Sequence, residues 1–162
     1  MKRLISLVLF SLSAHAIAGA ADTCTAPDMA GLRSTWQAFR NASLHGTPDQ
    51  IAKYYKLPVK LLSPMDGDKP FKLDRKPFMA HYPAIFRKDV AGEESELIKN
   101  LRRTKDNEYI SDVYFNREKC AFVGAIRIND YNFVQDKKAG WLIESVYFGG
   151  DYYYLQDMAS DK

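Results

Sequence analysis

The order of the sequence patterns predicts an α+β fold, in which N-terminal helices pack on a mainly antiparallel sheet. Apolar residues recur at three- and four-residue spacing over much of the first hundred residues, which is typical of amphipathic helices. From residue 110 onward, runs rich in Val, Ile, Tyr and Phe are separated by polar turns, which is typical of strands. No internal repeat or linker divides the chain, so we expect residues 22–162 to form a single α+β domain.

The first 21 residues are expected to be a cleavable export signal. Lys2 and Arg3 precede the apolar run 4–12, and small residues fill most of 14–21. A charged head, a short apolar centre and a small-residue end are the three parts of a secretory signal. The sequence therefore predicts a periplasmic or secreted protein with no membrane insertion after signal cleavage.

The rest of the chain is almost electrically neutral. Without Lys2 and Arg3, the 23 basic residues fall to 21 against 20 acidic ones, which leaves a net charge of +1. No basic stripe remains along the sequence, so nucleic acid is not an expected partner.

Two helices are expected at the start of the domain. Pro27-Asp28 begins the first helix, which carries one apolar stripe and is stopped by His45-Gly46. Thr47 and Gln50 have the spacing of a capping box, with a proline between them at the first helical position. A second, short helix is therefore expected to start there.

The middle of the chain is predicted to hold a hairpin followed by two more helices. Strands are expected at 58–62 and 71–73, because the segment between them is rich in Pro, Gly and Asp. Asp74 is the expected cap of a helix that Pro83 ends or kinks. A charged, amphipathic helix is expected at 93–101.

Three strands are expected at 110–115, 120–128 and 141–148, and a short edge strand near 151–155. The polar stretch 129–140 reads as a connection. Both sides of the strand 120–128 are largely apolar, so we expect it to be covered on both faces. The helical layer is one cover, and the other is a second subunit, a curl of the sheet or the wall of a pocket.

The two cysteines of the mature chain, Cys24 and Cys120, are expected to form a disulfide. Two lone cysteines in an oxidising compartment most often pair. This bridge would tie the N-terminal end of the domain to a central strand. A reactive thiol is the alternative, although nothing near either cysteine would lower a thiol pKa convincingly.

The succession of elements resembles the nuclear transport factor 2-like superfamily, the cystatin-like α+β cone, and in particular its small secreted bacterial members. The resemblance covers most of 27–148 and rests on the two helices, Leu57-Pro58-Val59, the helix over 74–86 and the last strand over 140–148. It implies a curved, cone-like sheet around helices, with a cavity at the wide end. Members include isomerases, dehydratases, small-ligand binders and interaction or immunity proteins. Because the fold alone does not choose among these, no catalytic residue is carried over.

Acid–base chemistry is the candidate enzyme activity, with Asp112, Glu144 and His81 as the candidate catalytic residues. A carboxylate among apolar neighbours has a raised pKa and can exchange a proton near neutrality. The alternatives are an ion pair of Arg127 with Asp112 or Glu144, and a core or rim position for His81. His45 and His81 are not at metal-ligand spacing, so neither a metal nor another cofactor is expected.

Tyrosines are the more promising feature of a binding surface. The chain has 10, and Tyr is common at interfaces because it is rigid and amphipathic. Consecutive tyrosines on a strand point to opposite faces, so part of the C-terminal triplet is exposed unless its own subunit covers it. The candidate binding residues are Tyr54, Tyr55, Tyr82, Arg127, Tyr152, Tyr153 and Tyr154.

These observations leave two functions open. The first is an exported, non-catalytic protein that binds a protein partner, for example as an inhibitor or immunity protein, or a small apolar ligand, through the open end of the sheet. The second is a cofactor-free acid–base enzyme, isomerase- or dehydratase-like, with a carboxylate in the cone cavity. A homodimer through the sheet is compatible with both. A buried carboxylate in a closed pocket would favour the enzyme, and a wide tyrosine-lined surface would favour the binding protein.

Overall fold

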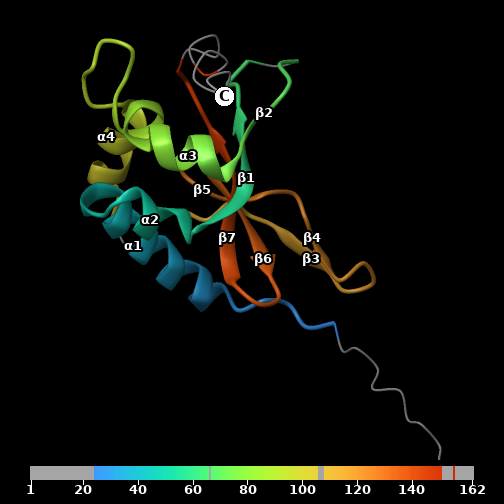
Figure 1. Ribbon diagram of the computed structural model, residues 1–162. Coiled ribbons are helices and arrows are strands. Elements are labelled where there is room, and N and C mark those ends of the chain that lie inside the picture. The colour runs from blue at the N-terminus through green and yellow to red at the C-terminus, as the bar shows by residue number, and fades with distance from the viewer. Residues whose placement is uncertain (1–23, 66, 106–107, 151–154, 156–162) are drawn as a thin grey trace, which may run out of the picture.

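Helices cover one face of a twisted five-stranded sheet, and a separate two-stranded hairpin extends from the sheet (Figure 1). The computed structural model describes residues 24–65, 67–105, 108–150 and 155. The predicted α+β fold is confirmed. The expected signal, residues 1–21, and Tyr152–Tyr154 lie outside the described residues. Among the described residues, no helix combines the length and the apolar composition needed to cross a membrane.

The first two helices form as their caps predict. In α1 (Met29–His45), the Asp28 carboxylate accepts a backbone N–H of the first turn at 2.8 Å. Gly46 is the C-cap of this helix and donates its N–H to the Ala42 oxygen at 2.6 Å. A Cβ there would lie only 2.7 Å from that oxygen, so the close approach requires glycine. In α2 (Pro48–Ala52), both hydrogen bonds of the expected capping box are present.

The sheet is mixed rather than fully antiparallel. Its strands run in the order β2-β1-β7-β6-β5, with one parallel pair, β1 with β7, and antiparallel pairing elsewhere. Their bounds are β1 (Tyr55–Leu62), β2 (Phe71–Leu73), β5 (Ile126–Ile128), β6 (Tyr131–Asp136) and β7 (Gly140–Tyr147). The hairpin expected between residues 58 and 73 is therefore present as β1 and β2, and β1 starts earlier than the sequence indicated.

Strand β6 occupies the stretch that the sequence analysis took for a connection, so that prediction was wrong. Tyr131 and Phe133 point into the core, whereas the polar residues of the strand lie mostly on the other face. The turn before it is only two residues long, since Ile128 and Tyr131 are register partners. Asn129, the first turn residue, has a φ of 49°, which Asn tolerates better than most residues.

The expected continuous strand over 120–128 is also corrected. It is divided into β4 (Ala121–Val123) and β5, and Gly124 between them has a φ of 97°. Strand β4 pairs with β3 (Tyr114–Asn116) in the separate hairpin. Glycine alone adopts this φ without strain, so the chain turns out of the main sheet at this point. Most of 121–125 is exposed in the described single chain, so neither the helical layer nor a curl of the sheet covers this segment.

The remaining helices differ from prediction at their ends. Helix α3 (Arg75–Tyr82) ends at Pro83, as expected, and the chain continues as the π-helix η1 (Pro83–Arg87), which the sequence did not predict. Helix α4 (Glu96–Arg103) starts three residues later than predicted, because Glu94 is held in a β-bridge with Lys88. Ser95 caps α4 by accepting the Ile98 N–H at 3.3 Å.

Arg87 joins η1 to the end of α1. Its guanidinium donates to the backbone oxygens of Ser43 at 3.1 Å and Gly46 at 2.6 Å. A positive charge at these carbonyls complements the negative end of the α1 dipole. The same guanidinium lies 5.6 Å from the centre of the Tyr82 ring, so one side chain connects two helical segments and the core.

Candidate functional site

Aromatic rings fill the space between the helices and the sheet, where a cone-shaped fold would place a cavity. Neighbouring ring centres lie 4.9–5.8 Å apart along the path from α1 to η1. The rings belong to Trp36, Phe39, Tyr55, Phe78, Tyr82, Phe86 and Tyr131, all of them buried. Rings at these spacings gain from tilted and edge-on contacts as well as from burial. We call this set the aromatic core.

Two of the candidate binding residues, Tyr55 and Tyr82, belong to the aromatic core and not to a contact surface. They are 5% and 1% exposed, so neither can touch a partner from the outside. Tyr55 was expected on the inner face of the second helix, but it is the first residue of β1, and its side chain is buried. Tyr54 is half-buried, with the Lys53 ammonium 5.1 Å from the centre of its ring.

Burial controls the ionisation of the core tyrosines. Burial raises the pKa of Tyr82 to about 12 and raises the pKa values of Tyr55 and Tyr131 above their usual range. Neighbouring phenols strengthen the effect on Tyr55 and Tyr131. The hydroxyl of Tyr55 has no hydrogen-bond partner among the described residues. All three side chains are therefore neutral at physiological pH.

The candidate catalytic residues lie apart from the aromatic core and from one another. Asp112 is exposed, and its N–H donates to the Tyr109 hydroxyl at 3.2 Å. The Glu144 carboxylate lies 3.8 Å from the Lys60 ammonium, and both side chains are partly exposed. His81 is half-buried at the end of α3. No group of three or more His, Cys, Asp or Glu in the described part of the chain is arranged to hold a metal ion.

Arg127 pairs with an aromatic ring, and neither of the ion pairs considered for it is formed. Its guanidinium lies 5.4 Å from the centre of the Tyr147 ring. The two side chains line a shallow polar depression of about 720 Å³ between the end of α4 and the β5–β6 turn. In it, Asn100 donates to Asp130 at 3.2 Å, and a second hydrogen bond joins the same helix end to the turn. These bonds tie α4 to the sheet.

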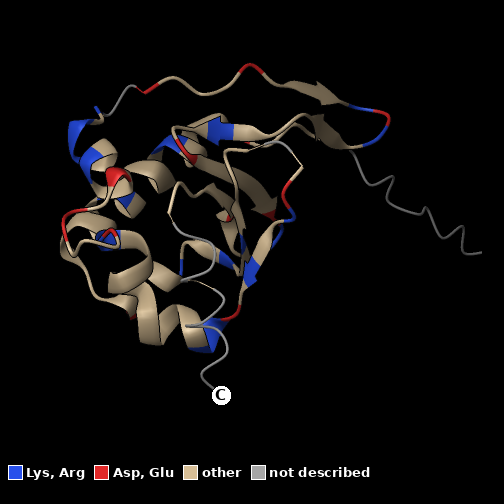
Figure 2. Ribbon diagram, turned by 90° about the horizontal axis from the view of Figure 1, so that it is seen from above, with Lys and Arg blue, Asp and Glu red and all other residues tan. Residues whose placement is uncertain are grey.

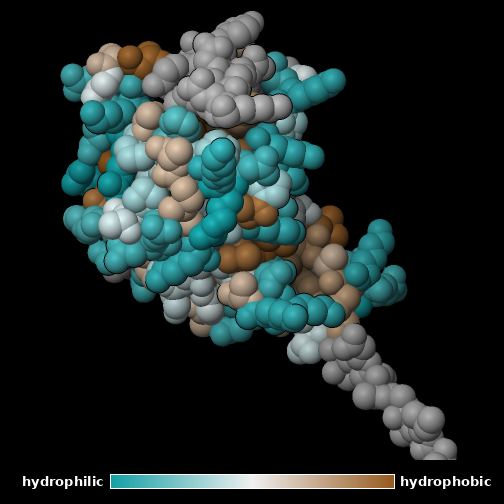
Figure 3. All heavy atoms as spheres, viewed as in Figure 1, coloured by the Kyte–Doolittle hydropathy of each residue, from teal (hydrophilic) through white to brown (hydrophobic). Residues whose placement is uncertain are grey.

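The hairpin carries an exposed apolar surface that the sequence analysis did not identify. Tyr109, Tyr114 and Val123 are 67%, 68% and 56% exposed. Tyr114 and Val123 are register partners in the β3–β4 pair, so their side chains share one side of it. The Tyr109 hydroxyl accepts the N–H of Asp112, two residues before β3, so Tyr109 lies beside the start of the hairpin. We call Tyr109, Tyr114 and Val123 the hairpin face. Figure 3 shows apolar side chains gathered over the sheet and hairpin on the right of the view, bordered by polar ones.

Packing on the other side of the hairpin explains why its outer side stays exposed. Phe115 and Phe122 are register partners with ring centres 5.0 Å apart, and Phe122 lies 6.2 Å from Trp141 of the main sheet. The Trp141 indole in turn donates to the Asp28 backbone oxygen at 3.1 Å. Since the inward residues hold the hairpin against the domain, Tyr114 and Val123 must point away from it.

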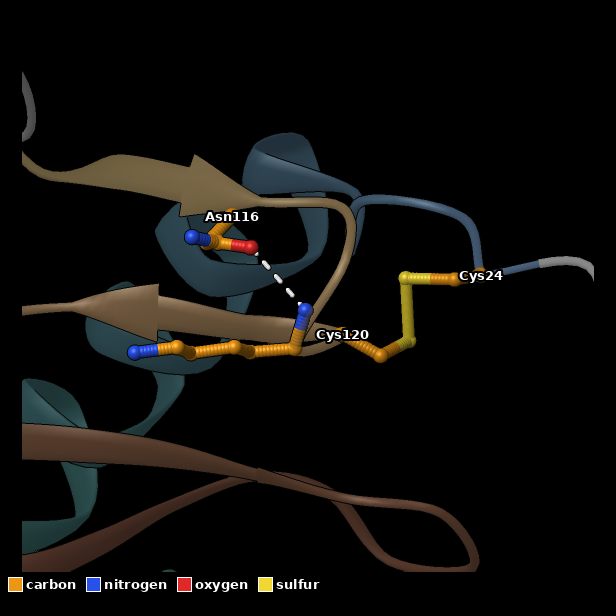
Figure 4. Close-up of a disulfide and its surroundings, with 4 residues drawn as sticks. Cys24, Asn116 and Cys120 are labelled. Atoms are coloured by element: carbon orange, nitrogen blue, oxygen red, sulfur yellow. Dashed lines mark hydrogen bonds between the residues drawn. A yellow bond between two sulfur atoms is a disulfide. The ribbon is translucent and has the colours of Figure 1, made fainter.

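A disulfide fixes the tip of the hairpin. Cys24 and Cys120 are bonded, with their Cα atoms 5.4 Å apart, as the sequence predicts (Figure 4). Cys120 lies in the hairpin turn and not in a central strand, which corrects that part of the prediction. The Lys119 N–H donates to the Asn116 side chain at 2.9 Å across the same turn. The turn also places acidic and basic residues at the hairpin tip (Figure 2).

Comparison with known proteins gives no relative for this chain: no family model, curated protein or solved structure matches it.

Proposed function

We propose that this chain is an exported, non-catalytic binding protein that engages a protein partner through the hairpin face. One observation carries the proposal. Of the five large hydrophobic side chains that are exposed in the described part of the chain, three form the hairpin face: Tyr109, Tyr114 and Val123. Clusters of exposed apolar side chains with a polar rim are typical of protein interaction sites.

The rigidity of the hairpin supports this function. The disulfide fixes one end, and the Phe115–Phe122–Trp141 contacts fix its inner side. A surface that is already ordered loses little conformational entropy when a partner binds, so more of the contact energy appears as affinity. Tyrosine suits such a surface, because it offers a large contact area with few rotatable bonds.

The strand edges of the hairpin add a second means of contact. β3 and β4 pair only with each other among the described strands, so each has one edge that no described strand covers. An extended segment of a partner can add to such an edge through backbone hydrogen bonds. The turn between the strands carries Arg117, Glu118 and Lys119, all exposed, which supply charges of both signs at the rim.

The export signal, the disulfide and the proposed binding surface fit together. Disulfides persist outside the cytoplasm, where residues 1–21 would send the chain. Small exported inhibitors and immunity proteins have this combination of features, and the cone superfamily includes such proteins. The acid–base alternative has less support, because Asp112 and Glu144 lie on the outside and large rings fill the aromatic core.

Site-specific photo-crosslinking tests the proposal. Tyr114 is replaced by a photoreactive phenylalanine in the full-length chain, and Val90, which is 72% exposed, is replaced in a control. We expect irradiation of the exported fraction to give one discrete adduct from position 114 and none from position 90. The adduct partner is then purified, and its affinity is measured for two matched variants, Val123→Asp and Val90→Asp.

The proposal predicts that Val123→Asp weakens the complex by at least about tenfold, since a charge is buried in the contact, and that Val90→Asp leaves it within about twofold. Equal adduct yields at positions 114 and 90, or equal affinities of the two variants, contradict the proposal. An adduct of two copies of this chain would show that the hairpin face binds a second copy and not a different protein.

A further inference from the structure

A second, independent site lies at the opposite end of the molecule from the hairpin. A pocket of about 280 Å³ opens between η1, the segment 88–95, the start of α4 and the end of β7. Its apolar lining consists of Ala84, Ile85, Val90, Leu97 and Phe148. We propose that this pocket binds a small, uncharged, apolar molecule, a function beyond the protein partner proposed above.

Backbone hydrogen bonds and core packing hold the elements around the pocket in place. In η1 the Lys88 N–H donates to the Pro83 oxygen at 3.0 Å, which gives a turn wider than that of an α-helix. Such π-helical turns are often found at functional sites. Ile85 and Leu97, 2% and 8% exposed, join the pocket wall to the core. These contacts anchor this part of the pocket wall in the core.

The segment that forms the outer wall is held by one carboxylate. The Asp89 side chain accepts the N–H groups of Ala91 at 3.0 Å and Glu93 at 2.9 Å. The Asp89 N–H donates to the Glu93 oxygen at 2.9 Å, next to the β-bridge between Lys88 and Glu94. This segment carries Val90, whose exposed side chain lies at the pocket, so it presents an apolar group at a fixed position.

Three polar side chains of the lining, those of Asp89, Ser95 and Glu96, already have partners within the protein. The buried Ser95 hydroxyl donates to the Phe86 oxygen at 2.5 Å and accepts the Ile98 N–H. The Glu96 carboxylate binds Lys99 at 2.9 Å and Arg103 at 3.3 Å. These groups would gain little from a polar ligand, whereas the apolar walls gain from one that excludes water. The volume is close to the lower end of small-molecule sites, so the ligand is small.

A titration with the uncharged dye N-phenylnaphthylamine, whose fluorescence rises in apolar surroundings, tests the inference. In Ala84→Trp an indole fills the pocket, and Ala80→Trp places the same indole on exposed helix surface one turn earlier. Val90→Asp places a charge at the pocket, and Val123→Asp places the same charge on the hairpin face. Circular dichroism confirms that each variant is folded. If Ala84→Trp does not fold, the comparison of dye affinity between Val90→Asp and Val123→Asp tests the inference on its own.

We expect saturable binding of one dye per chain. Ala84→Trp should weaken it at least about tenfold and Val90→Asp at least about threefold, with both controls within about twofold of the unchanged chain. No saturable binding, or equal losses in each matched pair, overturns the inference. Binding that Val123→Asp abolishes and Val90→Asp leaves intact also overturns it, because the dye then lies on the hairpin face. None of these outcomes bears on the crosslinking result.

Discussion

The Tyr55 hydroxyl offers a sharp test of the aromatic core. This side chain is 5% exposed, and its oxygen has no hydrogen-bond partner among the described residues. Burying a hydroxyl without a partner costs about 1–3 kcal/mol relative to a solvated one. The substitution Tyr55→Phe removes only that oxygen and keeps the ring against Phe39 and Phe78, with centres 5.7 and 5.0 Å away.

We therefore expect Tyr55→Phe to raise the free energy of unfolding by about 1–2 kcal/mol, although most core substitutions are destabilising. The melting temperature should rise by roughly 2–6 °C for a domain of this size. Tyr55→Ala, which removes the ring as well, should lower the free energy of unfolding by about 3–5 kcal/mol.

Urea denaturation followed by circular dichroism measures both changes. Tyr114→Phe serves as the control, because it removes a phenol oxygen from an exposed side chain and should change stability by less than about 0.5 kcal/mol. If Tyr55→Phe lowers stability by more than about 0.5 kcal/mol, the hydroxyl has a partner and the reasoning fails.

Three further predictions concern the disulfide, the core tyrosines and Gly124. Replacing both Cys24 and Cys120 by Ser should lower the free energy of unfolding by at most about 4–5 kcal/mol and speed amide exchange in the hairpin. An unchanged urea midpoint would show that the disulfide does not stabilise the fold. Phenols of the unfolded chain ionise near about pH 10, whereas burial raises the pKa of Tyr82 to about 12 and also raises those of Tyr55 and Tyr131. The stability that these neutral phenols contribute should thus be complete below about pH 10 and be lost as the pH rises toward 12. Their tyrosinate absorbance should appear together with unfolding. Ionisation of all tyrosines near about pH 10 in the folded protein would argue against the aromatic core. Gly124→Ala should lower the free energy of unfolding by about 1–2 kcal/mol, because φ is 97° there. Gly149→Ala should leave it nearly unchanged, because Gly149 has open space around its Cβ and no positive φ. Equal effects of the two substitutions in thermal unfolding would mean that the strand break does not depend on glycine at position 124.

Local signals in the sequence were sufficient for much of the N-terminal half. The caps at Asp28 and Thr47 and the stop at Gly46 are short-range chemistry, so their patterns predict α1 and the start of α2 closely, although α2 ends earlier than expected. The pairing of Cys24 with Cys120 followed from there being no other cysteine. Elements fixed by neighbouring residues can be predicted in this way because no distant part of the chain is needed to define them.

The errors arise where a distant part of the chain decides the outcome. The break at Gly124 depends on a backbone conformation that composition does not reveal, and it turns an expected covered strand into an exposed hairpin. The stretch 129–140 contains many polar residues and was therefore predicted to be a connection, although Tyr131 and Phe133 of β6 face the core. Tyr is found both in cores and at surfaces, so the sequence could not assign Tyr55 to the core or Tyr114 to the hairpin face.

The central claim is that binding takes place on the outside of the molecule, at the hairpin face. Amide hydrogen exchange of the oxidised protein, with and without the purified crosslinked partner, tests it most directly. We expect the partner to slow amide exchange across residues 109–125 and to change exchange little in α1, in β1 and in η1 beside the pocket. Protection centred on β1 and β6, which frame the aromatic core, with none in the hairpin, would contradict it.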